Sequence, residues 1–252
     1  PVVKKFVISP IENEWKSTTS ILRSLIGKVR LNGNLMLNIG PTSNGSVPYE
    51  IEKRFEEVGN WLANYGKSVY DAGAFDLRND LHDWGLTTYK KGKNGKNYIF
   101  LNIFDSQPGK VLKFTGITES PKEVNLLSKN KKIELEFNFT KAVTAIKIPN
   151  NLPDPYVNVI EMKFNKKPNA DLDLVAETKY GGHSLNYLNA FSSNGEGIKN
   201  EPKRYGSIPK NIEINDSLTM KWKVFIDKPS VYILDTSYNF QKKITDGFLS
   251  LK

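Results

Sequence analysis

The first seventy residues change from a helical to an extended hydrophobic pattern and back. Apolar side chains recur at helical spacing over residues 17–30 and again over residues 48–65, which predicts two amphipathic helices. Between them, residues 35–39 form a short apolar run that only Asn38 interrupts. Such a run is typical of a strand buried on both faces of a parallel sheet. No similar unit follows, so we expect the strand and the helix stripes to need sister strands outside this sequence.

From Trp84 onward the pattern changes to short alternating strands. The predicted strands cover residues 86–90, 98–104, 111–115, 123–127, 133–139, 143–148 and 157–164. Turn sequences rich in Gly, Asn and Pro separate them, for example at 93–95 and 107–109. Strands at this spacing predict an antiparallel β-sandwich.

After residue 167 the regular alternation of strands and turns gives way to a less ordered pattern. Residues 180–205 are rich in Gly, Ser and Asn and predict long loops, while strands are predicted at 212–214, 218–226 and 231–238. We therefore expect a mixed α and β fold in three parts: 1–70, a 71–166 sandwich and a second small β-rich unit over 167–252.

The composition of the chain excludes several classes of functional site. The chain has no Cys, which excludes disulfides, thiolate metal sites and a Cys nucleophile, and its two histidines, His82 and His183, are too far apart for a local metal motif. We expect no cofactor and no metal. No apolar stretch approaches the roughly 20 residues of a membrane span.

The net charge of +9 raises the question of an anionic partner. The lysines form short runs at 90–91, 129–132 and 166–167, where turns are expected. Solvated loop charge is therefore the preferred interpretation, with no nucleic-acid partner, and attraction to anionic glycans or cell surfaces is the alternative.

Two groups of motifs occur in order along the chain. The first is NGNLMLNIGPTSNG at residues 32–45, with Trp15-Lys16-Ser17 before it and a helix with Gly59, Trp61, Leu62, Gly66 and Tyr70 after it. The second is Trp84-Gly85 with Thr87 and Thr88, followed by LPDPYVNVIEMKF at residues 152–164. Over roughly residues 6–164 the chain resembles the C-terminal part of α-L-fucosidases of glycoside hydrolase family 29.

The resemblance implies both a fold and an activity. It implies the terminal βα elements of a (β/α)8-type barrel over 1–70, followed by the antiparallel β-sandwich and a further small β unit. The implied activity is retaining hydrolysis that releases L-fucose from fucosylated glycans, in a periplasmic, extracellular or lysosomal-like location. Retention needs two carboxylates about 5–5.5 Å apart. In the family both lie upstream, so we assign no catalytic residue here and expect the chain to need an N-terminal catalytic segment as its partner.

The resemblance suggests two substrate-binding residues. Phe6 stands where the family has an aromatic wall of the fucose pocket, although the surrounding Lys5-Phe6-Val7-Ile8 departs from the family pattern, and a core Phe is the alternative. Asn38 follows the apolar run, at the end of the strand where barrel active sites lie. The alternative for Asn38 is a side chain that caps loop backbone.

Two other functions stay open from the sequence. The aromatic residues Tyr180, Tyr187, Tyr205 and Trp222 would suit a non-catalytic carbohydrate-binding β module, although Trp222 lies in an alternating pattern that favours the core. An independent enzyme that uses carboxylates of this chain ranks last. Its candidates, namely Glu50, Glu52, Asp76, Asp80 and Asp83, have simpler explanations at a helix start or in a solvated loop.

Overall fold

The computed structural model describes residues 15–75, 77, 82–105, 107–129, 131–171, 173–185, 222–226, 231 and 233. Two helices come first, α1 (Thr18–Val29) and α2 (Tyr49–Tyr65), and a 3₁₀ turn, η1 (Gly66–Ser68), continues α2. The strands that follow are β1 (Gly85–Lys91), β2 (Asn97–Ile103), β3 (Val111–Thr115), β4 (Glu123–Ser128), β5 (Lys131–Glu134), β6 (Phe137–Thr140), β7 (Val143–Lys147) and β8 (Asn158–Phe164).

The helix boundaries follow from local chemistry. Ser17 caps α1, because its hydroxyl accepts a hydrogen bond from the Ser20 N–H at 3.2 Å. Pro48 precedes α2, and Glu50 and Glu52 lie in its first turn, where carboxylates complement the helix dipole. Both helices confirm the sequence prediction to within one residue at each end.

The strands form two antiparallel sheets. The larger has five strands in the order β1-β2-β8-β4-β5, and the smaller has three in the order β3-β7-β6. Side chains on one face of the larger sheet and those of β3 and β7 form one hydrophobic cluster that includes Leu101, Phe114, Leu126, Ile146 and Ile160. The mixed α and β class and its antiparallel sheets are thus confirmed.

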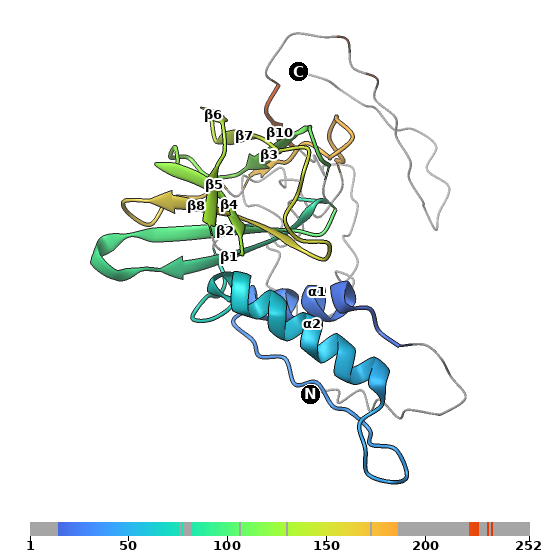
Figure 1. Cartoon of the computed structure of the whole chain (residues 1–252). Helices are drawn as coiled ribbons and strands as arrows, with labels where there is room; N and C mark the ends of the chain where they lie inside the picture. Colours follow the sequence, from blue (N-terminus) through green and yellow to red (C-terminus); the bar gives the residue numbers. More distant parts are fainter. Residues whose placement is uncertain are drawn as a thin grey trace, which may run out of the picture.

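The opposite face of the five-stranded sheet is covered by the two helices (Figure 1). Leu22 and Ile26 of α1 and Trp61 of α2 are buried against Phe100 and Val159 of the sheet. The buried indole of Trp61 also donates a hydrogen bond to the Val157 carbonyl at 2.9 Å. The expectation that the helix stripes need strands outside the sequence is therefore wrong for these residues, because the chain's own sheet buries them, whereas Phe55 of α2 stays exposed.

Two strand predictions also need correction. Residues 35–39 are extended but belong to no strand, since none of the described strands pairs with their backbone. Residues 133–139 are not one strand but parts of two, because the chain passes from the larger to the smaller sheet there. The Leu135 N–H still bonds the Val124 carbonyl of β4, whereas the Glu136 carbonyl accepts from Lys147 at the end of β7.

The last part of the chain is described only in pieces. A two-stranded parallel sheet joins β9 (Leu174–Val175) to β10 (Lys223–Val224). The strands predicted at 212–214 and 231–238 lie outside the described residues, apart from Val231 and Ile233. No helix among the described residues combines the length and apolarity that a membrane crossing needs.

Candidate functional site

The segment between the two helices is the first candidate. After α1, Asn32 adopts the left-handed region at φ +57°, and its side-chain oxygen accepts a hydrogen bond from the Ala74 N–H at 2.8 Å. The chain then runs extended along the helices, on the side away from the sheets (Figure 1). A turn at residues 42–46, closed by the Thr42 N–H to the Ser46 carbonyl at 2.8 Å, leads into α2.

This segment and the first turns of α2 expose apolar side chains that a folded core normally buries. Met36 is 81% exposed and Tyr49 is 70% exposed. We call the following exposed residues the apolar face: Leu31, Met36, Ile39, Val47, Tyr49 and Phe55. Contiguous exposed apolar surface usually marks a contact with another protein segment.

The predicted substrate-binding residues fall on or beside this segment. Asn38 is exposed in the extended stretch between Leu37 and Ile39. Phe6 lies outside the described residues. The proposed contact of Asn38 with sugar thus stays a prediction.

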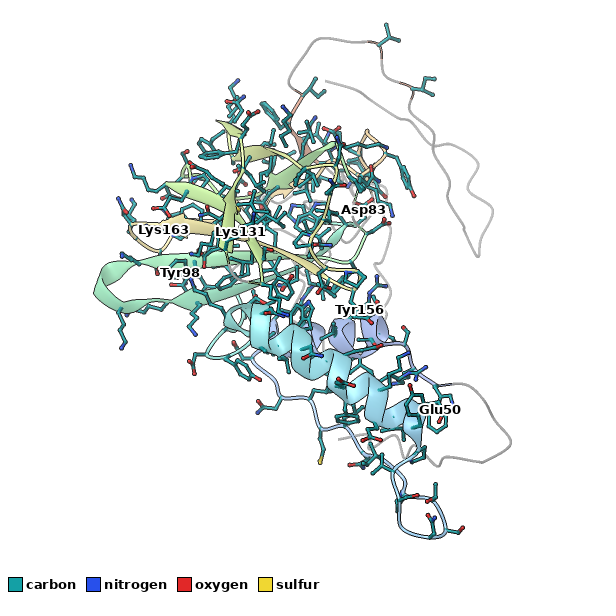
Figure 2. All side chains as sticks on the ribbon, viewed as in Figure 1. Glu50, Asp83, Tyr98, Lys131, Tyr156 and Lys163 are labelled. Carbon is teal, nitrogen blue, oxygen red and sulfur yellow. The ribbon has the colours of Figure 1, made fainter. Side chains whose placement is uncertain are left out.

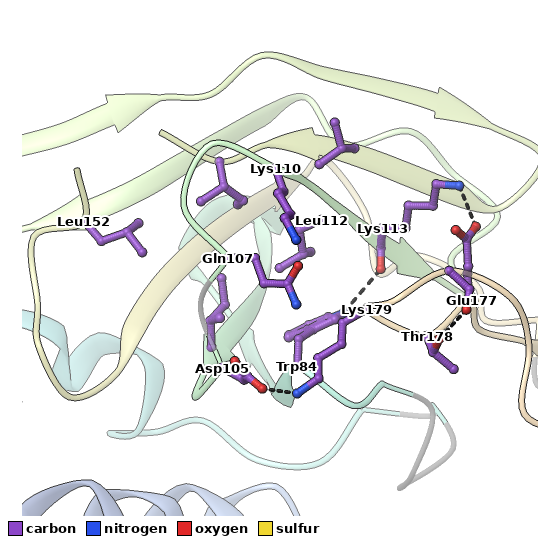
Figure 3. A pocket seen from close by; sticks show the side chains of 14 residues that line it. Trp84, Asp105, Gln107, Lys110, Leu112, Lys113, Leu152, Glu177, Thr178 and Lys179 are labelled. Atoms are coloured by element: carbon purple, nitrogen blue, oxygen red, sulfur yellow. Dashed lines mark hydrogen bonds and ion pairs between the residues drawn. The ribbon is translucent and has the colours of Figure 1, made fainter. Parts of the chain in front are cut away.

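A pocket at one end of the two sheets is the second candidate (Figure 3). It has a volume of about 80 Å³. The apolar part of its lining comes from Trp84, Leu112 and Leu152. Polar side chains are contributed by Gln107 and Lys110. The indole of Trp84 donates to the Lys113 carbonyl at 3.3 Å, which fixes the ring at this end.

Ion pairs occupy much of the polar lining. Lys179 pairs with Asp105, and this hydrogen bond raises the pKa of the lysine. Lys113 pairs with Glu177 at 2.5 Å. Ligand pockets are usually about 300–1,000 Å³, so this cavity is small for a sugar ring. We therefore regard the segment between the helices as the stronger candidate.

Known proteins match the part of the chain that contains this segment. Residues 4–67, which contain the apolar face, match the family model described as Alpha-L-fucosidase. The chain is related to the α-L-fucosidases. An α-L-fucosidase of Dictyostelium discoideum is 27% identical over 59% of this chain and 33% of its own length.

Solved fucosidase structures resemble the fold. Alpha-L-fucosidase isoenzyme 1 from Paenibacillus thiaminolyticus aligns with a TM-score of 0.50 and 26% identity, over 63% of this chain and 36% of that one. The α-L-fucosidase from Vibrio sp. strain EJY3 aligns with a TM-score of 0.59 and 23% identity, over 72% of this chain and 31% of that one. The chain thus spans about a third of the length of these fucosidases.

The three described carboxylates among the catalytic candidates, Glu50, Glu52 and Asp83, do not share a site. Glu50 and Glu52 are exposed at the start of α2. Asp83 accepts hydrogen bonds from the Lys179 N–H at 3.1 Å, at the edge of the pocket. Asp76 and Asp80 lie outside the described residues. Among the described residues there is also no cluster of His, Asp and Glu suited to a metal ion.

The residues of the alternative sugar-binding module are partly described. Tyr180 is exposed beside the pocket, with the Lys179 ammonium 5.0 Å from its ring centre. Trp222 is half-buried, and Tyr187 and Tyr205 lie outside the described residues. No specific arrangement of these aromatics favours the alternative.

The sequence did not single out Glu161, a carboxylate that is fully buried and paired with two lysines. The Glu161 side chain, on the helix-facing side of β8, has no exposed surface and pairs with both Lys67 and Lys132. Lys67 also lies 4.2 Å from the centre of the Tyr98 ring. The only signal was a Glu within the apolar run of 157–164, and the partners come from distant parts of the sequence.

Proposed function

We propose that this chain is part of a retaining α-L-fucosidase that releases L-fucose from glycans, and that it is not catalytically complete by itself. In this proposal residues 1–70 supply the last helix-strand-helix of a catalytic α/β barrel, 71–166 a β-sandwich and 167–252 a further β-rich unit. The observation that carries it is the apolar face, which lies within the part of the chain that matches the fucosidase family.

The physical argument concerns residues 35–39. This segment is extended, and its backbone has no strand partner in the described structure. Its side chains expose apolar surface worth roughly 1.5–3 kcal/mol for each large residue that becomes buried. Neighbouring parallel strands would satisfy its backbone and cover both of its faces at once. In that arrangement Asn38 would lie at the strand end that faces the substrate.

A complementation assay tests the proposal. The chain is mixed with a fucosidase from which the segment matching residues 4–164 has been deleted, and hydrolysis of 4-nitrophenyl α-L-fucoside is followed. We expect no turnover with either part alone and turnover with both. Leu37→Asp should abolish the gain, because it places a charge in the new sheet. Val111→Asp, a matched change at an exposed apolar residue of β3, should leave it intact.

Two results would overturn this proposal. One is fucoside hydrolysis by the chain alone, since the nucleophile and the acid/base are proposed to lie elsewhere. The other is equal complementation by the Leu37→Asp and Val111→Asp variants, since the apolar run would then have no role in assembly.

A location outside the cytoplasm also belongs to the proposal, supported by relatives such as the plasma α-L-fucosidase of Homo sapiens.

A further inference from the structure

Three lysine-bearing segments that are distant in sequence meet at one end of the five-stranded sheet. Lys91 pairs with Asn97 across β1 and β2, and Asn97 pairs with Phe164 of β8. One residue further in, Lys163 pairs with Glu123 at the start of β4. The register therefore gathers residues 90–97, 119–123 and 163–167, and we call these three segments the lysine edge.

The lysine edge carries most of the net charge of the protein. It contains eight lysines and two glutamates, a net charge of +6, compared with +9 for the whole chain. Figure 2 shows Lys163 and Tyr98 at this end of the sheet, away from the end that carries Asp83. The fold thus brings together at one end of the sheet lysines that the sequence disperses into short runs.

Neighbouring carboxylates neutralise only a part of this charge. Glu123 pairs with Lys163, and Glu119 lies 3.7 Å from Lys166. The pKa of Glu123 is lowered, first by its hydrogen bond with Lys163 and further by the charges of Lys163, Lys132 and Lys96.

Four lysines of the edge point into solvent. They are Lys91, Lys93, Lys96 and Lys122, which are exposed and form no ion pair within the described part of the chain. Lys91 ends β1, and Lys93 and Lys96 belong to the turn between β1 and β2, which the left-handed Gly95 (φ +75°) keeps tight. They span the width from β1 to β4, roughly 15 Å at about 4.8 Å per strand.

We propose that the lysine edge binds an anionic polysaccharide, through ion pairs with its sulfate or carboxylate groups. A fixed array of like charges raises the local concentration of polyanions and releases their counterions on binding. The choice of a polysaccharide rests on the proposed function, in which the chain belongs to an enzyme of glycans. The lysine edge would then hold an acidic glycan close to that enzyme.

The composition of the edge argues against two other polyanions. Proteins that bind single-stranded nucleic acids use exposed aromatic rings on which the bases stack. The ring of Tyr98 is instead covered by Lys67 at 4.2 Å and stacked on Phe100. A protein surface that binds a membrane usually has apolar side chains beside its lysines, and these insert into the lipid. None of the large exposed apolar side chains of the described residues lies in the lysine edge.

Binding to heparin, a sulfated polysaccharide, tests the proposal by calorimetry at 50, 100 and 200 mM salt. The test variant combines Lys91→Gln, Lys93→Gln and Lys96→Gln. The control combines Lys110→Gln, Lys129→Gln and Lys131→Gln, which removes the same charge from exposed lysines outside the edge. Lys131 pairs with Ser128, at the opposite end of β4 from Glu123. Circular dichroism establishes that both variants keep the fold.

We expect the test variant to bind heparin at least tenfold more weakly at 100 mM salt. The slope of log affinity against log salt should also fall by about 2, since each lost contact contributes about 0.7–0.9. The control variant should bind within threefold of the original chain. Hyaluronan, which carries carboxylates only, shows by comparison with heparin which of the two anionic groups is bound.

Several results would overturn the proposal. They are no heparin binding at 50 mM salt, equal weakening by the test and control variants, or tighter binding to duplex DNA or to phosphatidylserine vesicles than to either polysaccharide. The fucoside complementation assay separates this proposal from the previous one. Heparin binding without complementation would refute the fucosidase function alone, while complementation without heparin binding would refute the lysine edge alone.

Discussion

The buried carboxylate of Glu161 permits a sharp test of how charge is accommodated between the helices and the sheet. Its side chain has 0% exposure, whereas the side chains of its partners Lys67 and Lys132 are 39% and 47% exposed. Removing the carboxylate leaves two ammonium groups that water still reaches. Removing both ammonium groups leaves a charge that water does not reach. We therefore expect the two perturbations to differ in cost.

The magnitudes follow from this asymmetry. The double substitution Lys67→Met and Lys132→Met should lower the free energy of unfolding by about 3–5 kcal/mol at pH 7, the usual cost of a buried charge without its partner. Met keeps the apolar contact of Lys67 with the Tyr98 ring, so packing changes little. Glu161→Gln should cost only about 1–2 kcal/mol, because an uncharged amide can still accept hydrogen bonds.

Urea unfolding followed by tryptophan fluorescence measures both costs. Adding Glu161→Gln to the double variant should recover most of the loss. A matched control, Lys91→Met with Lys93→Met, changes exposed lysines and should cost below 1 kcal/mol. Equal costs for Glu161→Gln and the double lysine variant would refute the reasoning.

Three further predictions concern the core and the apolar face. Burial lowers the pKa of His82 to about 3, and its Nε2 accepts a hydrogen bond from the Thr115 N–H at 2.9 Å. Because the unfolded chain binds this proton near pH 6.5, stability should fall by up to about 1.4 kcal/mol per pH unit from pH 6.5 toward 3, and His82→Gln should flatten that slope in urea titrations at several pH values. Trp61→Phe removes the indole hydrogen bond to Val157 and buried volume, so it should lower stability by about 2–3 kcal/mol in thermal unfolding, and an unchanged midpoint would contradict the assigned packing. In amide exchange, residues 31–47 should exchange faster than β2 and β8, and equal protection would show that the apolar face is already covered.

The structure changes the expectation for residues 1–70. From the sequence alone, strands outside this chain were expected to bury both the apolar run at 35–39 and the helix stripes. The structure separates these two parts. The helices are held by the sheet through contacts such as Trp61 with Val157, whereas the segment between them and the first turns of α2 expose the residues of the apolar face.

The sequence by itself determined the elements whose signals are local. Helical spacing located α1 and α2, and alternation with turn residues located most strands, because each of these patterns depends on neighbours a few residues away. The order of two motif groups was enough to indicate the fucosidase family, which the comparisons then confirmed over part of the chain.

Only the tertiary structure decided the features that depend on long-range register. The apolar run at 35–39 contained a strand signal, but a strand exists only where another backbone pairs with it, and none does so among the described residues. The switch between sheets at Leu135, the burial of Glu161 between two lysines and the lysine edge likewise arise from partners far away in sequence. Charge and burial are properties of position in space, and local patterns alone do not fix that position.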